Sequence, residues 1–158
     1  MADYILALRK LVGKRKLIHP GVRVLVENDK GEFLFIRRTD NGNWGIPAGG
    51  FEENESIVEC AKREVLEETG LELLDVQLIG ISSQPFHETV EYPNGDQTQY
   101  LSIEFYSNQW TGQLKTNPQE TLEVVFKPLA HKIYLPLQEQ RTFEHLAQFK
   151  QEKRVIVE

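Results

Sequence analysis

Nine positions between Gly49 and Leu71 follow one spacing pattern, and the pattern predicts a helix that carries a row of carboxylates directly after a glycine-rich turn. Residues three and four apart share a face of a helix, so Glu64 would lie beside both Glu67 and Glu68. A glycine follows these acids at a point where helices commonly end. The nine positions are Gly49, Glu55, Arg63, Glu64, Val65, Glu67, Glu68, Gly70 and Leu71.

The acidic face of this predicted helix favours a bound cation. Two carboxylates about 4 Å apart repel each other by roughly 1 to 4 kcal/mol, depending on the local polarity. Arg63 stands next to the acids, where it would pair with Glu55 or Glu67, and the preceding glycines let backbone carbonyls approach the same ion. All-oxygen ligands suit Mg²⁺ or Mn²⁺ better than Zn²⁺. The alternative is a solvated acidic face, which is the usual role of glutamate runs.

The helix is expected to span residues 54–69. Asn54 or Ser56 would cap its start, and Glu55 would lie near the positive end of the helix dipole. Apolar side chains at every fourth position would form the buried stripe. These side chains are Ile57, Ala61 and Val65.

Length and composition set the broad class of the protein. With 158 residues, we expect one domain spanning residues 1–158. The single cysteine, Cys60, rules out an intrachain disulfide and fits a reducing compartment. The apolar run at residues 4–8 is too short for a signal peptide or a membrane span, so we expect a cytoplasmic protein without a membrane partner. A net charge of −6 argues against a nucleic-acid partner, although residues 9–23 are basic.

Periodicity and turn signals outline the rest of the chain. We expect an N-terminal helix at residues 3–13, a core at residues 21–136 and a C-terminal helix at residues 137–150. A turn at residues 28–31 would join two strands into a hairpin, and Asn94-Gly95 marks another hairpin. The expected strands are residues 22–26, 33–36, 71–81, 91–92, 97–106 and 122–126, with a loop at residues 82–87.

The pattern from Gly49 to Leu71 is a complete Nudix box, and the chain resembles the Nudix hydrolases, which split nucleoside diphosphates linked to another moiety. The likeness covers about residues 21–136. It implies an α/β/α sandwich around a mixed β-sheet, with the box as a loop–helix–loop. It also implies a site for Mg²⁺ or Mn²⁺ and two residues that position the box helix. The implied metal ligands are Glu64, Glu67, Glu68 and a carbonyl near Ala48 or Gly49, and the positioning residues are Glu55 and Arg63.

A general base is expected outside the box. The candidate is Glu120, because some Nudix relatives carry a loop glutamate there, and the alternative is an exposed loop acid. Glu104 is the weaker choice. It lies on the more polar face of a strand in which apolar and polar residues alternate, the other face being buried.

Substrate contacts are expected from segments that flank the box. Arg37 and Arg38 end a strand, and since strand neighbours face opposite ways, only one of them would reach a phosphate. Trp44 would stack on a base or serve in packing. Phe86 follows Pro85, in a region where relatives differ according to substrate and where members that cleave ADP-ribose also carry a proline. The remaining candidates lack ligand spacing and are interpreted as structural: His19, His131, His145 and Cys60.

These features predict a Mg²⁺-dependent nucleotide hydrolase. The favoured substrate is ADP-ribose or a nucleotide sugar, and Ala48 also occurs in members that cleave ADP-ribose. The alternatives are an oxidised nucleoside triphosphate, a dinucleoside polyphosphate or an RNA cap, the last disfavoured by the acidic balance. A non-catalytic sensor is the alternative from another class, but sensors typically lose box acids, and all are present here. The amphipathic N-terminal segment leaves a homodimer open.

Overall fold

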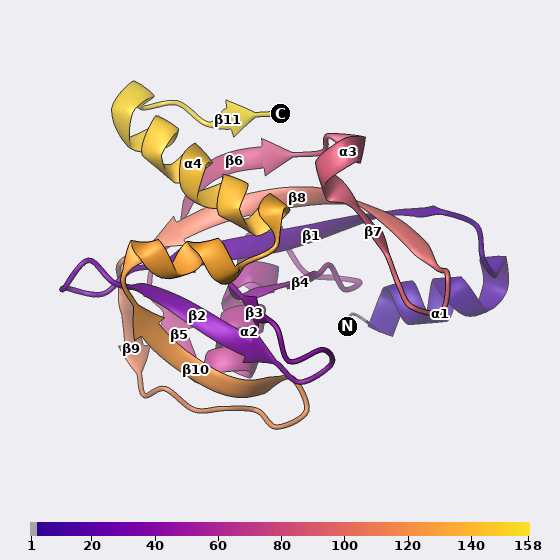
Figure 1. The fold of residues 1–158 in the computed structure, drawn as a ribbon, viewed down its shortest axis with the longest axis horizontal. Coiled ribbons are helices and arrows are strands. Elements are labelled where there is room, and N and C mark those ends of the chain that lie inside the picture. The colour runs from indigo at the N-terminus through magenta and orange to yellow at the C-terminus, as the bar shows by residue number, and fades with distance from the viewer. Residues whose placement is uncertain (1–2) are drawn as a thin grey trace.

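Helices separate runs of strands in the computed structural model, which describes residues 3–158 (Figure 1). The helical segments are α1 (Asp3–Val12), α2 (Ile57–Thr69), α3 (Pro85–Glu88), the 3₁₀ helix η1 (Leu129–Tyr134) and α4 (Leu137–Glu152). The strands are β1 (Leu17–Val26), β2 (Phe33–Arg38), β3 (Trp44–Gly45), β4 (Ala48–Gly50), β5 (Leu71–Leu73), β6 (Gln77–Ser82), β7 (Thr89–Glu91), β8 (Gln97–Ser107), β9 (Trp110–Gly112), β10 (Thr121–Lys127) and β11 (Ile156–Val157).

The largest sheet is mixed, with the strand order β11-β6-β8-β1-β4 and with β7 paired to β8. Strand β1 runs parallel to β8 along its whole length and antiparallel to β4. A second sheet has the order β10-β2-β3, and β5 pairs with β9. Strand β4 contains Gly49, the first residue of the pattern, and lies at an edge of the large sheet, so residues 51–56 lead from that edge to α2.

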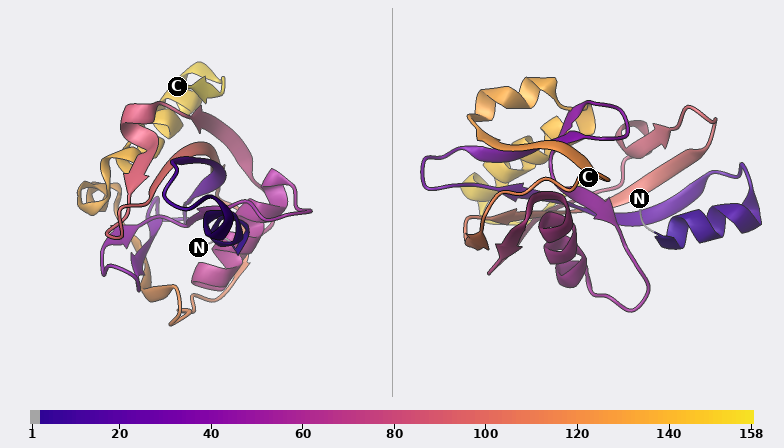
Figure 2. Two further views of the ribbon diagram at one scale, coloured as in Figure 1. Left: turned by 90° about the vertical axis from the view of Figure 1, so that its right-hand side faces the viewer. Right: turned by 90° about the horizontal axis from the view of Figure 1, so that it is seen from below.

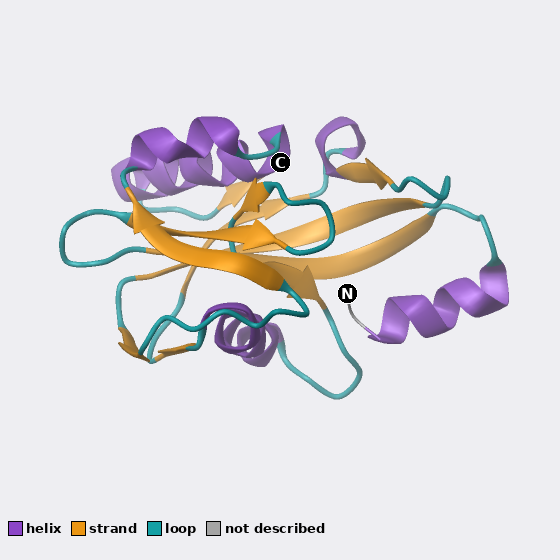
Figure 3. Ribbon diagram, turned by 60° about the horizontal axis from the view of Figure 1, so that its bottom comes forward, coloured by secondary structure: helices purple, strands orange, loops and turns teal. Residues whose placement is uncertain are grey.

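Figure 3 shows the strands between two helical layers, with α2 on one side and α4 on the other. Alternate residues of β1 serve both layers, because successive strand residues face opposite ways. Val22, Val24 and Val26 pack toward α2, where they join Ala61 and Val65 in one core cluster. The opposite cluster packs against α4 and includes Leu25, Phe35, Ile46, Phe143 and Leu146. The predicted α/β/α sandwich around a mixed sheet is therefore confirmed.

Helix α1 lies at one end of the molecule, beside the turn between β7 and β8 (Figure 2). Ile5 packs against Leu17 in a small separate cluster. Arg9 ties the helix to β8 by donating to the carbonyl of Gln97 at 3.0 Å. Among residues 3–158, no helix combines the length and the apolar character that crossing a bilayer requires.

The predicted hairpin between residues 22–26 and 33–36 is wrong. Strand β1 pairs with β8 and β4, whereas β2 pairs with β10 and β3. Only an isolated bridge between Glu27 and Phe33 links the two segments in the described part of the chain. The turn does form, since Gly31 has a φ of +75°. Both predicted segments are buried, and each pairs with distant strands in a different sheet.

The predicted strand at residues 71–81 is also wrong, because it is two strands in different sheets. Strand β5 pairs with β9, and β6 pairs with β8. The predicted loop at residues 82–87 contains most of α3, which Pro85 begins at a position that suits proline. The sequence did not predict η1, β9 or β11, since such short elements depend on tertiary partners.

Candidate active site

Helix α2 begins at Ile57, later than predicted, because Ser56 caps it. The Ser56 hydroxyl accepts from the Glu59 N–H at 3.3 Å, and the Glu59 carboxylate accepts from the Ser56 N–H at 2.7 Å. This reciprocal pair is a capping box, and it satisfies two backbone donors at the helix start. Asn54, the alternative cap, has a φ of +67° and lies outside the helix. Gly70 ends the helix with a φ of +76°.

Arg63 connects the acidic residues of the box. Its guanidinium donates to Glu55 at 2.9 and 2.7 Å, to Glu64 at 2.8 Å and to Glu67 at 3.2 Å. It also donates to the carbonyl of Gly50 at 3.1 Å, just before the box helix. The arginine therefore fixes α2 to the preceding loop. Glu55, which precedes the helix instead of lying in its first turn, serves as the loop anchor.

Glu64 and Glu68 are buried against the backbone of β4. Glu68 Oε2 accepts from the Ala48 N–H at 3.1 Å. A Cβ placed on Gly49 would lie 1.9 Å from Glu64 Cδ, so only glycine leaves room for this carboxylate. Burial raises the pKa of Glu64 to about 7 and raises the pKa of Glu68 well above its usual range. Both carboxylates thus lack full compensation for their charge within the protein.

Glu120 lies beside these two carboxylates, although it is distant from them in the sequence. Its negative charge contributes to the raised pKa of Glu64 and of Glu68. Its backbone carbonyl accepts from the Thr39 N–H at 3.0 Å, which fixes the loop before β10. Glu120 Oε2 is buried and has no hydrogen-bond partner among residues 3–158. The structure therefore brings the proposed base to the box acids with an oxygen that is still able to accept.

Arg38 is the one of the two strand-end arginines that faces the box. Its positive charge opposes the raised pKa of Glu68, and it pairs with Asp40 at 3.1 and 3.2 Å. Arg37 points away, is exposed, and lies opposite Trp44 on the neighbouring strand. Only one of the two arginines was expected to reach a phosphate, and the structure favours Arg38 for that contact.

The two aromatic candidates lie in different settings. The Trp44 ring packs edge-on against His131, with ring centroids 4.6 Å apart. Phe86 is 84% exposed on α3 and therefore free to contact a ligand. Cys60 is buried, and burial raises the pKa of its thiol to about 12, which fits its interpretation as a structural residue.

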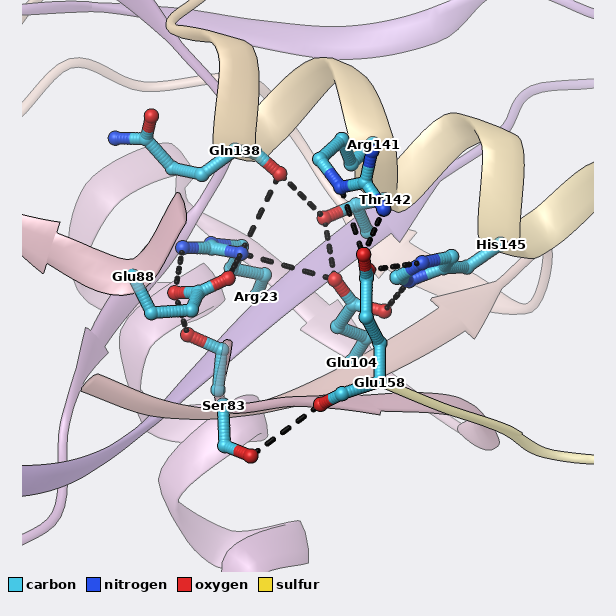
Figure 4. A network of polar contacts seen from close by, with 10 residues as sticks. Arg23, Ser83, Glu88, Glu104, Gln138, Arg141, Thr142, His145 and Glu158 are labelled. Carbon is cyan, nitrogen blue, oxygen red and sulfur yellow. Dashed lines mark hydrogen bonds and ion pairs between the residues drawn. The ribbon is translucent and has the colours of Figure 1, made fainter. Parts of the chain in front are cut away.

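A buried polar network lies on the α4 side of the large sheet (Figure 4). Arg23 of β1 pairs with both oxygens of Glu88 at 2.9 and 2.6 Å, and Arg23 also donates to the Gln138 carbonyl at 3.4 Å. Glu104 accepts from Thr142 at 2.8 Å and lies 2.6 Å from His145 Nδ1. The hydrogen bond to Glu104 raises the pKa of His145. Glu104, the weaker base candidate, is fully buried and bonded within this network.

Glu139 is a residue of the site that the sequence did not indicate. Its Oε2 accepts from the Ile46 N–H at 2.7 Å, two residues before Ala48. Arg23 and Arg38 both oppose the rise in its pKa that burial causes. In the sequence, an acid in the first turn of a helix that follows a proline indicates only a favourable interaction with the helix dipole. Nothing in the spacing links it to a backbone N–H 93 positions away.

The donor set suits a hard divalent cation that also binds other ligands. In residues 3–158, no three His, Cys, Asp or Glu side chains converge closely enough to enclose an ion. Glu67 in particular is held by Arg63 at the exposed rim. Mg²⁺ usually keeps several waters and takes one or two carboxylates plus substrate phosphates. The two buried glutamates, the free oxygen of Glu120 and the nearby glycine backbone fit that open type of site.

Comparison with known sequences places the chain in a family. A family model described as the NUDIX domain matches residues 17–149. The RNA pyrophosphohydrolase of Halorhodospira halophila is 43% identical over 61 residues, which are 39% of this chain and 34% of that protein. The enzyme of the same name from Pasteurella multocida is 38% identical over 63 residues, which are 40% of this chain and 32% of that protein. The match thus spans about a third of the length of these curated relatives.

Solved structures share the fold over most of the chain. The MutT protein from Methanosarcina mazei Go1 has a TM-score of 0.68 and 27% identity, covering 89% of this chain and 98% of that chain. An ADP-ribose pyrophosphatase from Streptococcus suis has a TM-score of 0.62 and 20% identity, with the same two coverages. The family model covers residues 17–149, including every position of the box. The chain therefore belongs to the Nudix family.

Proposed function

We propose that this chain is a metal-dependent pyrophosphohydrolase that splits a phosphoanhydride bond in a nucleoside diphosphate linked to another moiety. One observation carries the proposal: Glu64 and Glu68 are buried against the Ala48–Gly49 backbone, and Glu120 adds a third negative charge nearby. Arg63 and Arg38 offset this charge only in part, since the pKa of both buried carboxylates remains raised. Such a cluster of acids is costly unless a cation joins it.

Mg²⁺ or Mn²⁺ is the proposed cation, because every available donor is an oxygen. Glu64 and Glu68 would bind it, with Glu67 joining from the rim and a carbonyl of Ala48 or Gly49 completing the protein's share. When bound, such an ion would offset the charge of the diphosphate and lower the pKa of an attacking water.

The chain's own residues would hold the box and the substrate in position and would transfer the proton. Arg63 holds the loop and the helix of the box in register through Glu55. Arg38, on the α2 side of its strand, is the proposed contact for a substrate phosphate. Since phosphoryl chemistry depends mostly on positioning and electrostatics, these fixed charges are expected to provide much of the rate.

Glu120 is the proposed general base, and its replacement by glutamine tests that role. We expect Glu120→Gln to reduce kcat by about a hundredfold or more, because general base catalysis typically contributes that much. The measurement is the steady-state kcat at saturating Mg²⁺ and nucleotide. Glu123→Gln, which changes an acid on β10 close by in sequence, is the matched control and should keep its rate. A loss in Glu120→Gln of less than about tenfold, or about 1.4 kcal/mol, would withdraw the assignment.

ADP-ribose or a nucleotide sugar is the proposed substrate class. Its supports are Ala48 within the box pattern and Pro85 at the start of α3, with the exposed Phe86 next to it. A second candidate is the 5′ end of RNA, which is favoured by the shared stretch with the two RNA pyrophosphohydrolases. The presence of all the box acids argues against a sensor without activity.

A substrate panel tests the proposal. ADP-ribose, UDP-glucose, an oxidised deoxyguanosine triphosphate, a dinucleoside polyphosphate and a 5′-triphosphorylated RNA are compared by kcat/KM with Mg²⁺ and with Mn²⁺. We expect the first two to exceed the others by at least about tenfold, or about 1.4 kcal/mol in transition-state free energy. A preference for the RNA would replace the favoured substrate with the second candidate. Turnover of none of them with either ion would reject the enzyme proposal.

A further inference from the structure

The segment 46–50, which leads from Ile46 through β4, is held by carboxylates from both helical layers. Ile46 is fully buried, and its N–H donates to Glu139 Oε2 of α4 at 2.7 Å. Two residues later the Ala48 N–H donates to Glu68 Oε2 of α2 at 3.1 Å. Between them, the Pro47 carbonyl accepts from Val24 at 2.9 Å. Three successive residues are thus fixed by three different elements.

Glu139 is suited to this contact by its surroundings. It is 8% exposed and lies so close to β3 that a Cβ on Gly45 would come within 3.3 Å of its Oε2. Burial raises the pKa of Glu139, and the positive charges of Arg23 and Arg38 oppose that rise. Arg23 in turn is anchored by Glu88 and donates to the Gln138 carbonyl in the same turn of α4 (Figure 4). The carboxylate is therefore held in one place, with its acceptor aimed at Ile46.

We infer that Glu139 is a positioning residue for the metal site, acting through the Ile46 N–H on the backbone of Ala48 and Gly49. The inference rests on the proposed function, which assigns a metal-facing carbonyl to those two residues. A buried N–H left without an acceptor is costly, so the segment would move to find a new partner. That movement would displace the backbone opposite Glu64 and Glu68 without removing either acid.

Two substitutions distinguish the role of the length of the Glu139 side chain from the role of its charge. Glu139→Gln keeps the length of the side chain and an acceptor oxygen but removes the charge. Glu139→Asp keeps the charge but withdraws the oxygens by one methylene. Positioning by the hydrogen bond predicts that Gln is tolerated and Asp is not, whereas a role in the electrostatic field alone predicts the opposite order.

The measurement is a titration of this 158-residue chain with Mn²⁺ alone, in which electron paramagnetic resonance detects the free ion. Loss of a group that orients a metal site typically weakens binding by about 10- to 100-fold. We expect the Kd for Mn²⁺ to rise at least about tenfold in Glu139→Asp and to stay within about threefold of wild type in Glu139→Gln. Equal affinity in wild type and Glu139→Asp, or the reverse order of the two variants, overturns the inference.

Thr142→Val is the control for lost stability. It breaks the 2.8 Å hydrogen bond to Glu104 on the same helix but leaves Ile46 untouched. Thermal melts followed by circular dichroism should show a lowered Tm for this variant, with the Kd for Mn²⁺ within about twofold of wild type. A Kd that rises in Thr142→Val as much as in Glu139→Asp also overturns the inference. If wild type and Glu68→Gln bind Mn²⁺ equally well, the proposed metal site is wrong, whatever the role of Glu139.

Discussion

Replacing Glu68 with glutamine is expected to lower kcat/KM at least about a thousandfold, or about 4 kcal/mol in transition-state free energy. Glu68 is 6% exposed and lies at the centre of the proposed site, with Glu64 and Glu120 raising its pKa and Arg38 opposing that rise. Glutamine has nearly the same shape and still offers an oxygen to the Ala48 N–H, which Glu68 accepts at 3.1 Å. The charge is lost while the packing is kept, so the loss would report on the cation.

The measurement is kcat/KM on ADP-ribose with saturating Mg²⁺. Glu72→Gln removes an exposed acid shortly after the helix and serves as the matched control, which should keep wild-type activity. Wild-type turnover in Glu68→Gln would exclude Glu68 from the metal ligands and leave the box acids without their proposed role.

The stability of the same variant gives a second result with a defined pH dependence. The pKa of Glu68 is raised in the folded protein, chiefly by burial. Its contribution to stability is complete below the ordinary carboxyl pKa of about 4.3 and is lost as the pH rises through the folded-state value. Without added metal, the Tm of Glu68→Gln should therefore equal or exceed that of wild type by a margin that grows from about pH 5 to about pH 8. A lower Tm at every pH would mean that the ionised carboxylate stabilises the fold.

Gly49→Ala is expected to reduce kcat/KM by about a hundredfold while the protein still folds. The new Cβ would lie 1.9 Å from Glu64 Cδ and 2.0 Å from Glu64 Oε1, and these atoms end a flexible side chain. The carboxylate would swing away from β4 more readily than the backbone would shift. A displacement of about 1 Å in a catalytic group is able to cost this much, because the geometry of the site sets the rate.

Kinetics and Mn²⁺ titration of Gly49→Ala would both be compared with Gly13→Ala. Gly13 has a φ of +64°, and a Cβ there would meet no atom within 4 Å, so its replacement introduces backbone strain without a steric clash. We expect Gly13→Ala to lower the Tm but keep full activity, and Gly49→Ala to lose activity. Together these results would show that the loss in Gly49→Ala comes from the steric clash with Glu64 and not from backbone strain. Full activity in Gly49→Ala would mean that Glu64 is not needed where the structure places it.

The sequence was sufficient to predict how the box residues are arranged, because the box is local. Its acids follow one another along a single helix, and helical geometry alone brings Glu64 and Glu68 to one face. The pairing of Arg63 with Glu55 and Glu67 followed from the same short spacing and is present in the structure. The family likeness added the sandwich architecture, which the structure confirms.

Sheet partners could not be obtained in this way. The expected hairpin of residues 22–26 and 33–36 had suitable turn residues, yet its two strands are in separate sheets. Strand β1 instead lies beside β8 in parallel, a pairing between distant parts of the chain that no local pattern encodes. The prediction of one strand at residues 71–81 was wrong for the same reason, because its two halves pair with different strands.

By itself, the sequence determined the family and the acidic helix, and it predicted the kind of ion that such a helix would bind. Only the tertiary structure decided that Glu120 joins the box acids, that Arg38 faces them while Arg37 does not, and that Glu139 holds Ile46. The physical reason is the range of the contacts. Helical neighbours are fixed by a repeat of a few residues, whereas contacts across layers depend on how the whole core packs.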